Sequence, residues 1–177
     1  CVYNRLTHNG YERITDDVFL IRGFSGNVGV LRTDAGTVLV DSMMFPMQGK
    51  RIRELAEKLT GQPVRIVIST HYHPDHIGMA GWLCERWRVP FYMTQAEYLS
   101  GLSFSRMQKE DFSWSSAQHL QRSGFTPQQI EQARERFSGF GGYIKPMPMA
   151  YRRLVDGASL SINGNRWRVV VGRGHSP

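Results

Sequence analysis

Runs of apolar residues alternate with turn-forming residues along the first 94 positions, and this pattern predicts a sheet covered by helices. The expected strands cover residues 17–24, 28–33, 37–40, 64–69 and 91–93. The expected helices cover residues 48–60 and 75–87. The strand at 37–40 is almost wholly apolar, which is typical of a strand buried on both faces. Because strands and helices alternate after it, the pattern indicates an α/β fold with helices packed on a sheet.

The strand-like pattern stops at residue 94, and residues 95–150 show helix-like patterns that predict a helical insert. Helix-like segments cover 95–102, 108–122 and 127–137. The last one has a clear start, with Thr126 as the cap, Pro127 at the first position and a glutamine at position 129. A Gly- and Pro-rich segment follows at 138–148. We interpret the insert as a cover over the mouth of the active site that contributes apolar side chains; the alternative is that its helices simply pack on the core.

The β pattern returns near the end of the chain. Strands are expected at 159–162 and 166–171, joined by a hairpin turn at Asn163 and Gly164. The whole of residues 1–177 therefore predicts a single domain, a size that allows a sizeable core.

Composition limits the classes of protein that fit. Apolar residues make up 41% of the chain and charged residues 21%, as in soluble globular proteins. Since no apolar run is long enough to cross a membrane and the first residues do not resemble a signal peptide, we expect no membrane partner and a cytoplasmic location. The net charge is +7, but the arginines are scattered, so the charge does not favour nucleic acid as a partner and leaves it open.

The densest chemistry lies directly after the expected strand at 64–69. Four potential metal ligands, His71, His73, Asp75 and His76, occupy six positions. Imidazole and carboxylate suit a divalent ion, zinc first. His71 and His73 are two apart in an extended segment, so they can face the same way, whereas Asp75 and His76 enter a helix and can point to a neighbouring position. The segment thus predicts two incomplete half-sites, which need further ligands from elsewhere.

The spacing His71-x-His73-x-Asp75-His76-x-Gly78 resembles the signature of the metallo-β-lactamase-fold hydrolases. Residues 38–41, a strand ending in Asp41, resemble the first motif of that family. Residues 154–157 with the following hairpin, and residues 174–177, resemble the approach to its third motif. The resemblance covers residues 11–94 and 151–177. The commonest zinc β-lactamases carry arginine where this chain has His76. The residue points instead to a wider group of glyoxalase-II-like thioesterases, lactonases, the minority β-lactamase subclass and tRNA-processing nucleases, and the chain looks most like the glyoxalase-II-like and lactonase-like branch. The implied fold is an αβ/βα sandwich, represented by its N-terminal half and the start of its second half.

The resemblance also implies roles for residues. His71, His73 and His175 would bind a first zinc ion, and Asp75 and His76 a second. Asp75 would besides orient the attacking hydroxide as a catalytic group, and Asp41 would fix the ligand loop without binding metal itself. In relatives a later aspartate bridges both metals and a last histidine completes the second site. Neither follows Pro177, so we expect a C-terminally truncated member with an incomplete domain and, in the complete protein, two zinc ions, with iron or manganese as alternatives.

These roles predict a zinc-dependent hydrolase that uses a metal-bound hydroxide on a small-molecule thioester, lactone or β-lactam. Zinc makes water acidic enough to ionise near neutral pH, which supplies the nucleophile. One alternative is a metal-dependent nuclease, which the positive charge would suit. A second alternative is a non-hydrolytic, metal-binding relative of the same fold.

Overall fold

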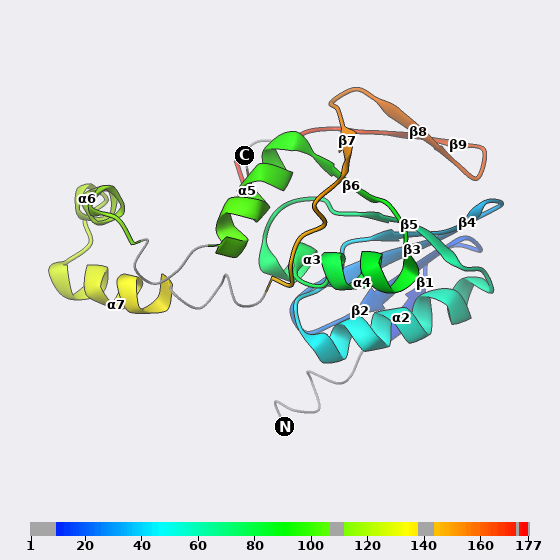
Figure 1. Ribbon diagram of the computed structural model, residues 1–177, viewed down its shortest axis with the longest axis horizontal. Helices are drawn as coiled ribbons and strands as arrows, with labels where there is room; N and C mark the ends of the chain where they lie inside the picture. Colours follow the sequence, from blue (N-terminus) through cyan, green and yellow to red (C-terminus); the bar gives the residue numbers. More distant parts are fainter. Residues whose placement is uncertain (1–9, 107–111, 138–143, 173, 177) are drawn as a thin grey trace.

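The computed structural model describes residues 10–106, 112–137, 144–172 and 174–176. In this part of the chain, seven strands form one sheet in the order in which they occur (Figure 1). They are β1 Tyr11–Arg13, β2 Val18–Arg22, β3 Asn27–Thr33, β4 Gly36–Val40, β5 Val64–Ile68, β6 Phe91–Thr94 and β7 Arg152–Leu154. Neighbours are antiparallel from β1 to β4 and parallel from β4 to β7. The predicted α/β class is confirmed.

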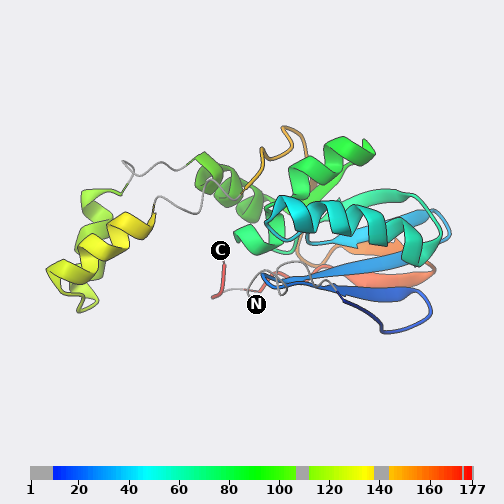
Figure 2. The same ribbon diagram turned by 90° about the horizontal axis from the view of Figure 1, so that it is seen from below.

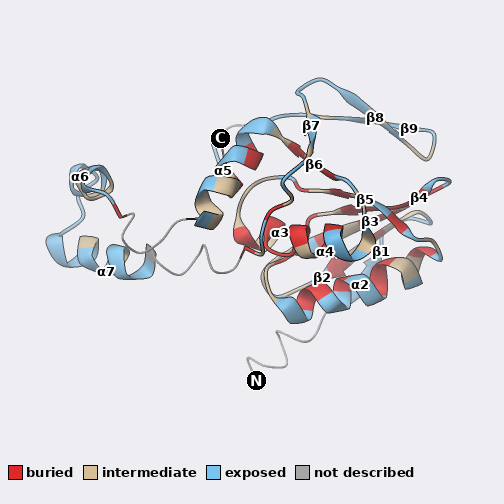
Figure 3. Ribbon diagram, in the orientation of Figure 1, coloured by how far each residue is buried: buried red, intermediate tan, exposed pale blue. Residues whose placement is uncertain are grey.

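Helices cover one face of this sheet. Helix α2 (Pro46–Thr60) packs on β2, β3 and β4, and α4 (Ala80–Trp87) packs on β5 and β6 (Figure 2). Val30, Leu39 and Val67 lie side by side on adjacent strands and are fully buried. They join one apolar core with Ile52 of α2 and Leu83 of α4. Figure 3 shows buried positions on both helices and on the strands of the sheet. This burial is the main force that fixes the helices on the sheet.

A separate hairpin lies over the opposite face. Its strands are β8 Ser159–Ile162 and β9 Asn165–Arg168. Because side chains alternate along a strand, Leu31, Val40 and Ile68 point away from the helices. They line a largely apolar cavity of about 280 Å³ together with Leu160 and Trp167 of the hairpin. The strand at 37–40 is therefore covered on both sides, as its apolar sequence predicts.

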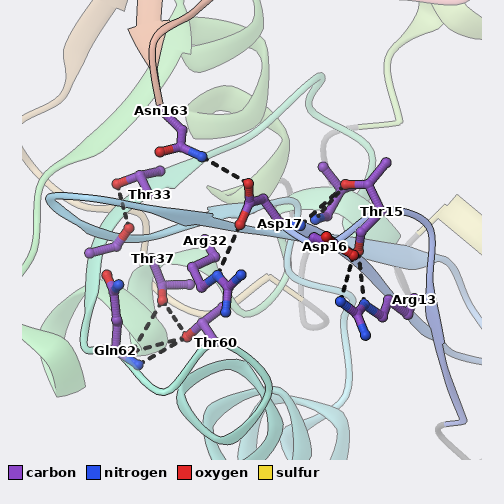
Figure 4. Close-up of polar contacts among 12 residues, drawn as sticks. Arg13, Thr15, Asp16, Asp17, Arg32, Thr33, Thr37, Thr60, Gln62 and Asn163 are labelled. Atoms are coloured by element: carbon purple, nitrogen blue, oxygen red, sulfur yellow. Dashed lines mark hydrogen bonds and ion pairs between the residues drawn. The ribbon is translucent and has the colours of Figure 1, made fainter.

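Polar contacts attach this hairpin and α2 to the sheet (Figure 4). The Nδ2 group of Asn163, at the hairpin turn, donates a hydrogen bond to Asp17 at 2.9 Å, and Arg32 of β3 contacts the same carboxylate at 2.9 Å. The hydroxyls of Thr37 and Thr60 are 2.6 Å apart and both are buried, which joins the start of β4 to the end of α2. These contacts connect elements that are far apart in the sequence.

The prediction of a single helix at 75–87 is wrong, since the structure has two helices there. Helix α3 (Pro74–Ile77) ends before Gly78, and α4 begins at Ala80. At the break the Met79 amide donates to the carbonyl of Met43 at 3.0 Å, and the Lys145 amide donates to the carbonyl of Gly78 at 2.8 Å. Backbone bonds to two distant segments thus replace the bonds that would continue the helix.

The region expected to be a helical insert contains three helices in its described part. Helix α5 (Gln95–Arg106) packs on β6, while α6 (Trp114–Arg122) and α7 (Pro127–Phe137) have their main contacts with each other. The predicted start of α7 is confirmed, because Thr126 and Gln129 exchange side chain–backbone hydrogen bonds of 2.9 and 3.3 Å. Figures 1 and 2 place α6 and α7 apart from the sheet, and the cover expected over the mouth of the active site stays a prediction.

Other differences concern the edges of the elements. Strands β1 and β7 were not among the expected strands, and β9 ends at Arg168 rather than at residue 171. The expected helix at 108–122 begins outside the described residues. The segment 138–143 of the Gly- and Pro-rich stretch also lies outside them. No helix in the described part of the chain combines the length and apolar character needed to span a membrane.

Candidate metal centre

The candidate ligands lie at the carboxyl ends of the parallel strands. Asp41 follows β4, the segment from His71 to His76 follows β5, and α5 follows β6. Because β4, β5 and β6 are parallel, these three ends meet at one edge of the sheet, the edge at which open α/β sheets bind ligands. The sheet topology therefore brings together groups that are separated by tens of residues.

Three histidines predicted as ligands of one metal ion converge there. The Nε2 atom of His71 lies 3.1 Å from Nδ1 of His73 and 3.3 Å from Nε2 of His175. One ring nitrogen from each residue lies within 4.8 Å of the other two. A tetrahedral ion with metal–nitrogen bonds of ~2.05 Å separates its ligand nitrogens by about 3.3 Å, so the cluster fits such an ion. The three residues could hold a divalent metal.

The protonation of the cluster also suits a cation. Burial lowers the pKa of His71, and the neighbouring His76 and His73 lower it further. Burial also lowers the pKa of His73, and His175 adds to that effect. The two rings therefore lose their protons more readily than exposed histidines. Unprotonated ring nitrogens that face one another repel, and a cation between them would remove that repulsion.

A hydrogen-bond relay from Asp41 sets the tautomer of His71. The hydroxyl of Thr70 lies 2.9 and 3.0 Å from the two carboxylate oxygens of Asp41 and 3.0 Å from Nδ1 of His71. A carboxylate only accepts, so the single hydroxyl proton goes to Asp41 and the hydroxyl accepts the Nδ1 proton of His71. The Nε2 lone pair of His71 is then free to face the cluster, which is the state that a metal ligand needs.

Asp41 orients His76 in the same way. Its Oδ2 atom accepts a hydrogen bond from Nδ1 of His76 at 2.8 Å, while Nε2 of His76 lies 3.3 Å from a carboxylate oxygen of Asp75. Burial lowers the pKa of His76, but the hydrogen bond and charge of Asp41, assisted by Asp75, outweigh burial and raise it. Asp75 and His76 thus form a second, smaller group beside the three histidines.

The backbone at Asp41 is unusual. Its φ of 66° lies in the left-handed region, which a residue with a side chain adopts at a cost of ~1–3 kcal/mol. The residue is 6% exposed, and its carboxylate accepts hydrogen bonds from the Thr70 amide, the Thr70 hydroxyl and His76. The hydrogen bonds hold the conformation that points this carboxylate at both groups of candidate ligands.

Two contributors to this edge were not singled out in the sequence. Thr70 lies between the strand and the first histidine, and Glu97 lies in the first turn of α5. The Glu97 carboxylate is buried and accepts a hydrogen bond from the backbone amide of Tyr72 at 2.8 Å and another from the hydroxyl of Ser176. The sequence carries no signal for Glu97, because its partners are 25 and 79 positions away.

A cavity of about 260 Å³ opens beside His71 and His175. Its described lining contains no lysine or arginine and consists of Thr70, His71, Thr94, Glu97, Val170, Val171, Gly172, His175 and Ser176. Its walls are thus part polar and part apolar, with two of the candidate ligands on one side. A small uncharged molecule could contact the ligand cluster from this cavity.

Similarity to known proteins extends over most of the chain. The model of the metallo-β-lactamase superfamily matches residues 21–177. A search of curated protein sequences gave no significant match. Among solved structures, a β-lactamase domain protein from Burkholderia ambifaria is 32% identical with a TM-score of 0.76, over 94% of this chain and 50% of that protein.

Two further structures share the fold. A metallo-β-lactamase family protein from Thermus thermophilus is 25% identical with a TM-score of 0.65, over 93% of this chain and 54% of its own. A subclass B3 metallo-β-lactamase of Bradyrhizobium japonicum is 17% identical with a TM-score of 0.62, over 100% of this chain and 57% of its own. The chain therefore spans about half the length of the solved structures it matches.

Proposed function

This chain belongs to the metallo-β-lactamase superfamily, whose fold supports metal-dependent hydrolysis, and we propose that its protein is a zinc-dependent hydrolase. The observation that carries the proposal is the convergence of His71, His73 and His175, whose ring nitrogens lie within 4.8 Å of one another. Imidazole nitrogen is a preferred ligand of zinc, and three such ligands leave a position open for water or substrate.

The remaining residues receive roles from their contacts. In our proposal Asp75 and His76 belong to a second zinc site, since the lone pair of His76 Nε2 lies beside the Asp75 carboxylate. Asp41 orients the ligands without binding metal itself. It contacts the ring of His76 directly and the ring of His71 through the hydroxyl of Thr70. Such supporting hydrogen bonds orient metal ligands in proteins generally.

The bound cation would supply Lewis acidity and would make water acidic enough to ionise near neutral pH. The chain's own groups bind and orient the reactants. Asp75 is half-buried beside the cluster, and a carboxylate accepts protons, so in our proposal it takes the proton of an attacking water and directs the lone pair of that water toward the substrate. The cavity beside His71 and His175 would hold the substrate's reacting group.

The cavity favours a substrate whose reacting group is an uncharged acyl carbonyl. It has no lysine or arginine among its described lining residues, and Val170 and Val171 give it an apolar side. A phosphodiester would be expected to meet cationic groups that stabilise its charge. A carbonyl compound such as a thioester, lactone or β-lactam needs no such group beyond the metal. We therefore propose this class of small molecule as the substrate.

The test combines metal analysis with a substrate panel on the full-length protein. We expect the purified protein to contain zinc and to hydrolyse at least one thioester, lactone or β-lactam. His71→Ala should lose both bound zinc and hydrolysis, by more than about 100-fold in rate. His119→Ala, which changes an exposed histidine of α6, is the matched control and should behave as the wild type.

Each other result has a definite meaning. Cleavage of phosphodiesters alone, with a rate that falls steeply as salt rises, would favour a nuclease and contradict the proposal. Bound metal without hydrolysis of any substrate in the panel would favour a non-hydrolytic relative. Full zinc content in His71→Ala would contradict the assignment of the ligands.

A further inference from the structure

Glu97 connects the two segments that carry the three-histidine cluster. One of its carboxylate oxygens accepts the backbone amide of Tyr72, which lies between His71 and His73, at 2.8 Å. The other oxygen accepts the hydroxyl of Ser176, the residue after His175. A single side chain thus touches the chain next to all three candidate ligands, although the two segments are about a hundred residues apart.

The burial of Glu97 makes this arrangement costly without a positive partner. Only 5% of the residue is exposed, and no ion pair of the described residues includes it. A buried carboxylate that has lost its water needs hydrogen bonds and a nearby opposite charge. Hydrogen bonds come from Tyr72 and Ser176. The nearby opposite charge would be a cation held by the histidines.

Glu97 faces the same cavity as two of the candidate ligands, so its charge lies near the position of a bound cation. Glu97, His71 and His175 all line the same cavity of about 260 Å³. Three neutral imidazoles leave the full charge of a divalent ion uncompensated, so a buried carboxylate nearby lowers the energy of the bound state. The hydrogen bonds of Glu97 go to the Tyr72 amide, between His71 and His73, and to the hydroxyl of Ser176, next to His175.

We propose that Glu97 is a positioning residue of the metal centre, which holds the segment His71–His73 and the segment His175–Ser176 at ligand distance and offsets part of the charge of the bound ion. This inference rests on the proposed function, because it assumes that the three histidines bind a divalent metal. It adds to that proposal a residue from α5, an element outside the family-like motifs of the sequence.

The test uses three substitutions in the full-length protein. Glu97→Gln keeps the size of the side chain and removes its charge, Glu97→Ala removes both, and Ser176→Ala removes one of the two hydrogen bonds. Glu85→Gln removes the same charge from an exposed position on α4 and serves as the control. For each protein we would measure the melting temperature without metal, the zinc affinity by chelator competition, and the visible spectrum of the cobalt(II)-loaded form.

We expect Glu97→Gln to bind zinc about 10–100-fold more weakly while the metal-free melting temperature changes little. Glu97→Ala should bind zinc more weakly still and should alter the cobalt(II) spectrum, which reports ligand geometry. Ser176→Ala should weaken binding in the wild-type background but add nothing to Glu97→Ala, because the hydrogen bond that it removes is already lost. Glu85→Gln should match the wild type.

The outcomes separate this inference from the function on which it rests. If the wild type binds zinc, His71→Ala does not, and Glu97→Gln keeps the wild-type affinity and cobalt(II) spectrum, the role of Glu97 is overturned and the metal centre stands. A fall in the metal-free melting temperature with unchanged zinc affinity would make Glu97 merely structural and would also overturn it. If the wild type binds no metal, both proposals fail.

Discussion

The Oδ2 atom of Asp41 accepts a hydrogen bond from Nδ1 of His76 at 2.8 Å, across 35 positions of the sequence. Asp41 is 6% exposed and follows the buried strand β4, whereas His76 lies in the short helix α3. The contact fixes the ring of His76 so that its other nitrogen faces Asp75. It also explains why the pKa of His76 is raised although the ring is partly buried.

The first prediction concerns the titration of His76. Burial alone would lower the pKa of His76, and the hydrogen bond and charge of Asp41 reverse that effect. In the metal-free protein, Asp41→Asn should therefore lower the pKa of His76, as measured by NMR titration of the ring protons. Asp34→Asn, an exposed aspartate in the β3–β4 turn, should leave it unchanged.

The same pair predicts a pH dependence of stability. A histidine whose pKa is raised on folding adds stability that is complete below its unfolded pKa, near 6.5, and is lost as pH rises through the raised value. The difference in melting temperature between the metal-free wild type and Asp41→Asn should thus be larger at pH 5.5 than at pH 9. Both pH values lie about 1 unit or more from the unfolded pKa of ~6.5. A difference that grows with pH would contradict the ion pair.

The second prediction tests the relay through Thr70. Its hydroxyl connects Asp41 to Nδ1 of His71, and valine has the same shape without the hydroxyl. Thr70→Val should weaken zinc binding by about 10–100-fold, because the ring of His71 loses the partner that sets its tautomer. Thr70→Ser keeps the hydroxyl and should retain most of the affinity in the same chelator competition. Equal affinities for the two variants would show that the hydroxyl is not needed.

The third prediction is that acid removes metal from the two groups of ligands at different pH. Protons compete with metal for each histidine, and the competition begins at higher pH where the pKa is higher. The pKa of His76 is raised, whereas burial lowers the pKa of His71 and of His73. As pH falls from about 8, zinc bound by Asp75 and His76 should therefore leave before zinc bound by the three histidines. Metal analysis after dialysis at stepped pH would show two stages, and loss of all zinc in one stage would contradict the ordering.

Much of the fold follows from local sequence, and helix α7 shows why. Its start needs only Thr126, Pro127 and Gln129, which are neighbours, so the predicted range 127–137 agrees with the structure. Strand β7 is different. It consists of Arg152, Arg153 and Leu154, which have no strong strand pattern, and it becomes a strand because it pairs with β6. Pairing with a distant strand overrides local preference there.

The candidate site also combines residues that local sequence reveals with residues that only distant contacts reveal. The spacing of His71, His73, Asp75 and His76 is local, so the sequence displays it. The contact of His175 with His71 was implied by resemblance to a family, and the structure places the two ring nitrogens 3.3 Å apart. Glu97 could not have been found, because a glutamate in the first turn of a helix looks like an ordinary exposed residue until its distant hydrogen-bond partners are known.

The last prediction concerns the packing of α4 against Pro146, which lies between α7 and β7. Gly81 of α4 is buried, and a Cβ atom added to it would lie 1.8 Å from the carbonyl oxygen of Pro146, which is backbone and has little room to move. In a free helix, replacement of glycine by alanine stabilises by ~0.5–1 kcal/mol. Here the clash should dominate, and Gly81→Ala should lower the free energy of unfolding by about 1–3 kcal/mol, a fall of roughly 2–12 °C in melting temperature. Gly10→Ala is the control, since its added Cβ would have no neighbour within 4 Å. Chemical denaturation of both variants measures the effect, and a Gly81→Ala protein as stable as the wild type would contradict the close contact between α4 and Pro146.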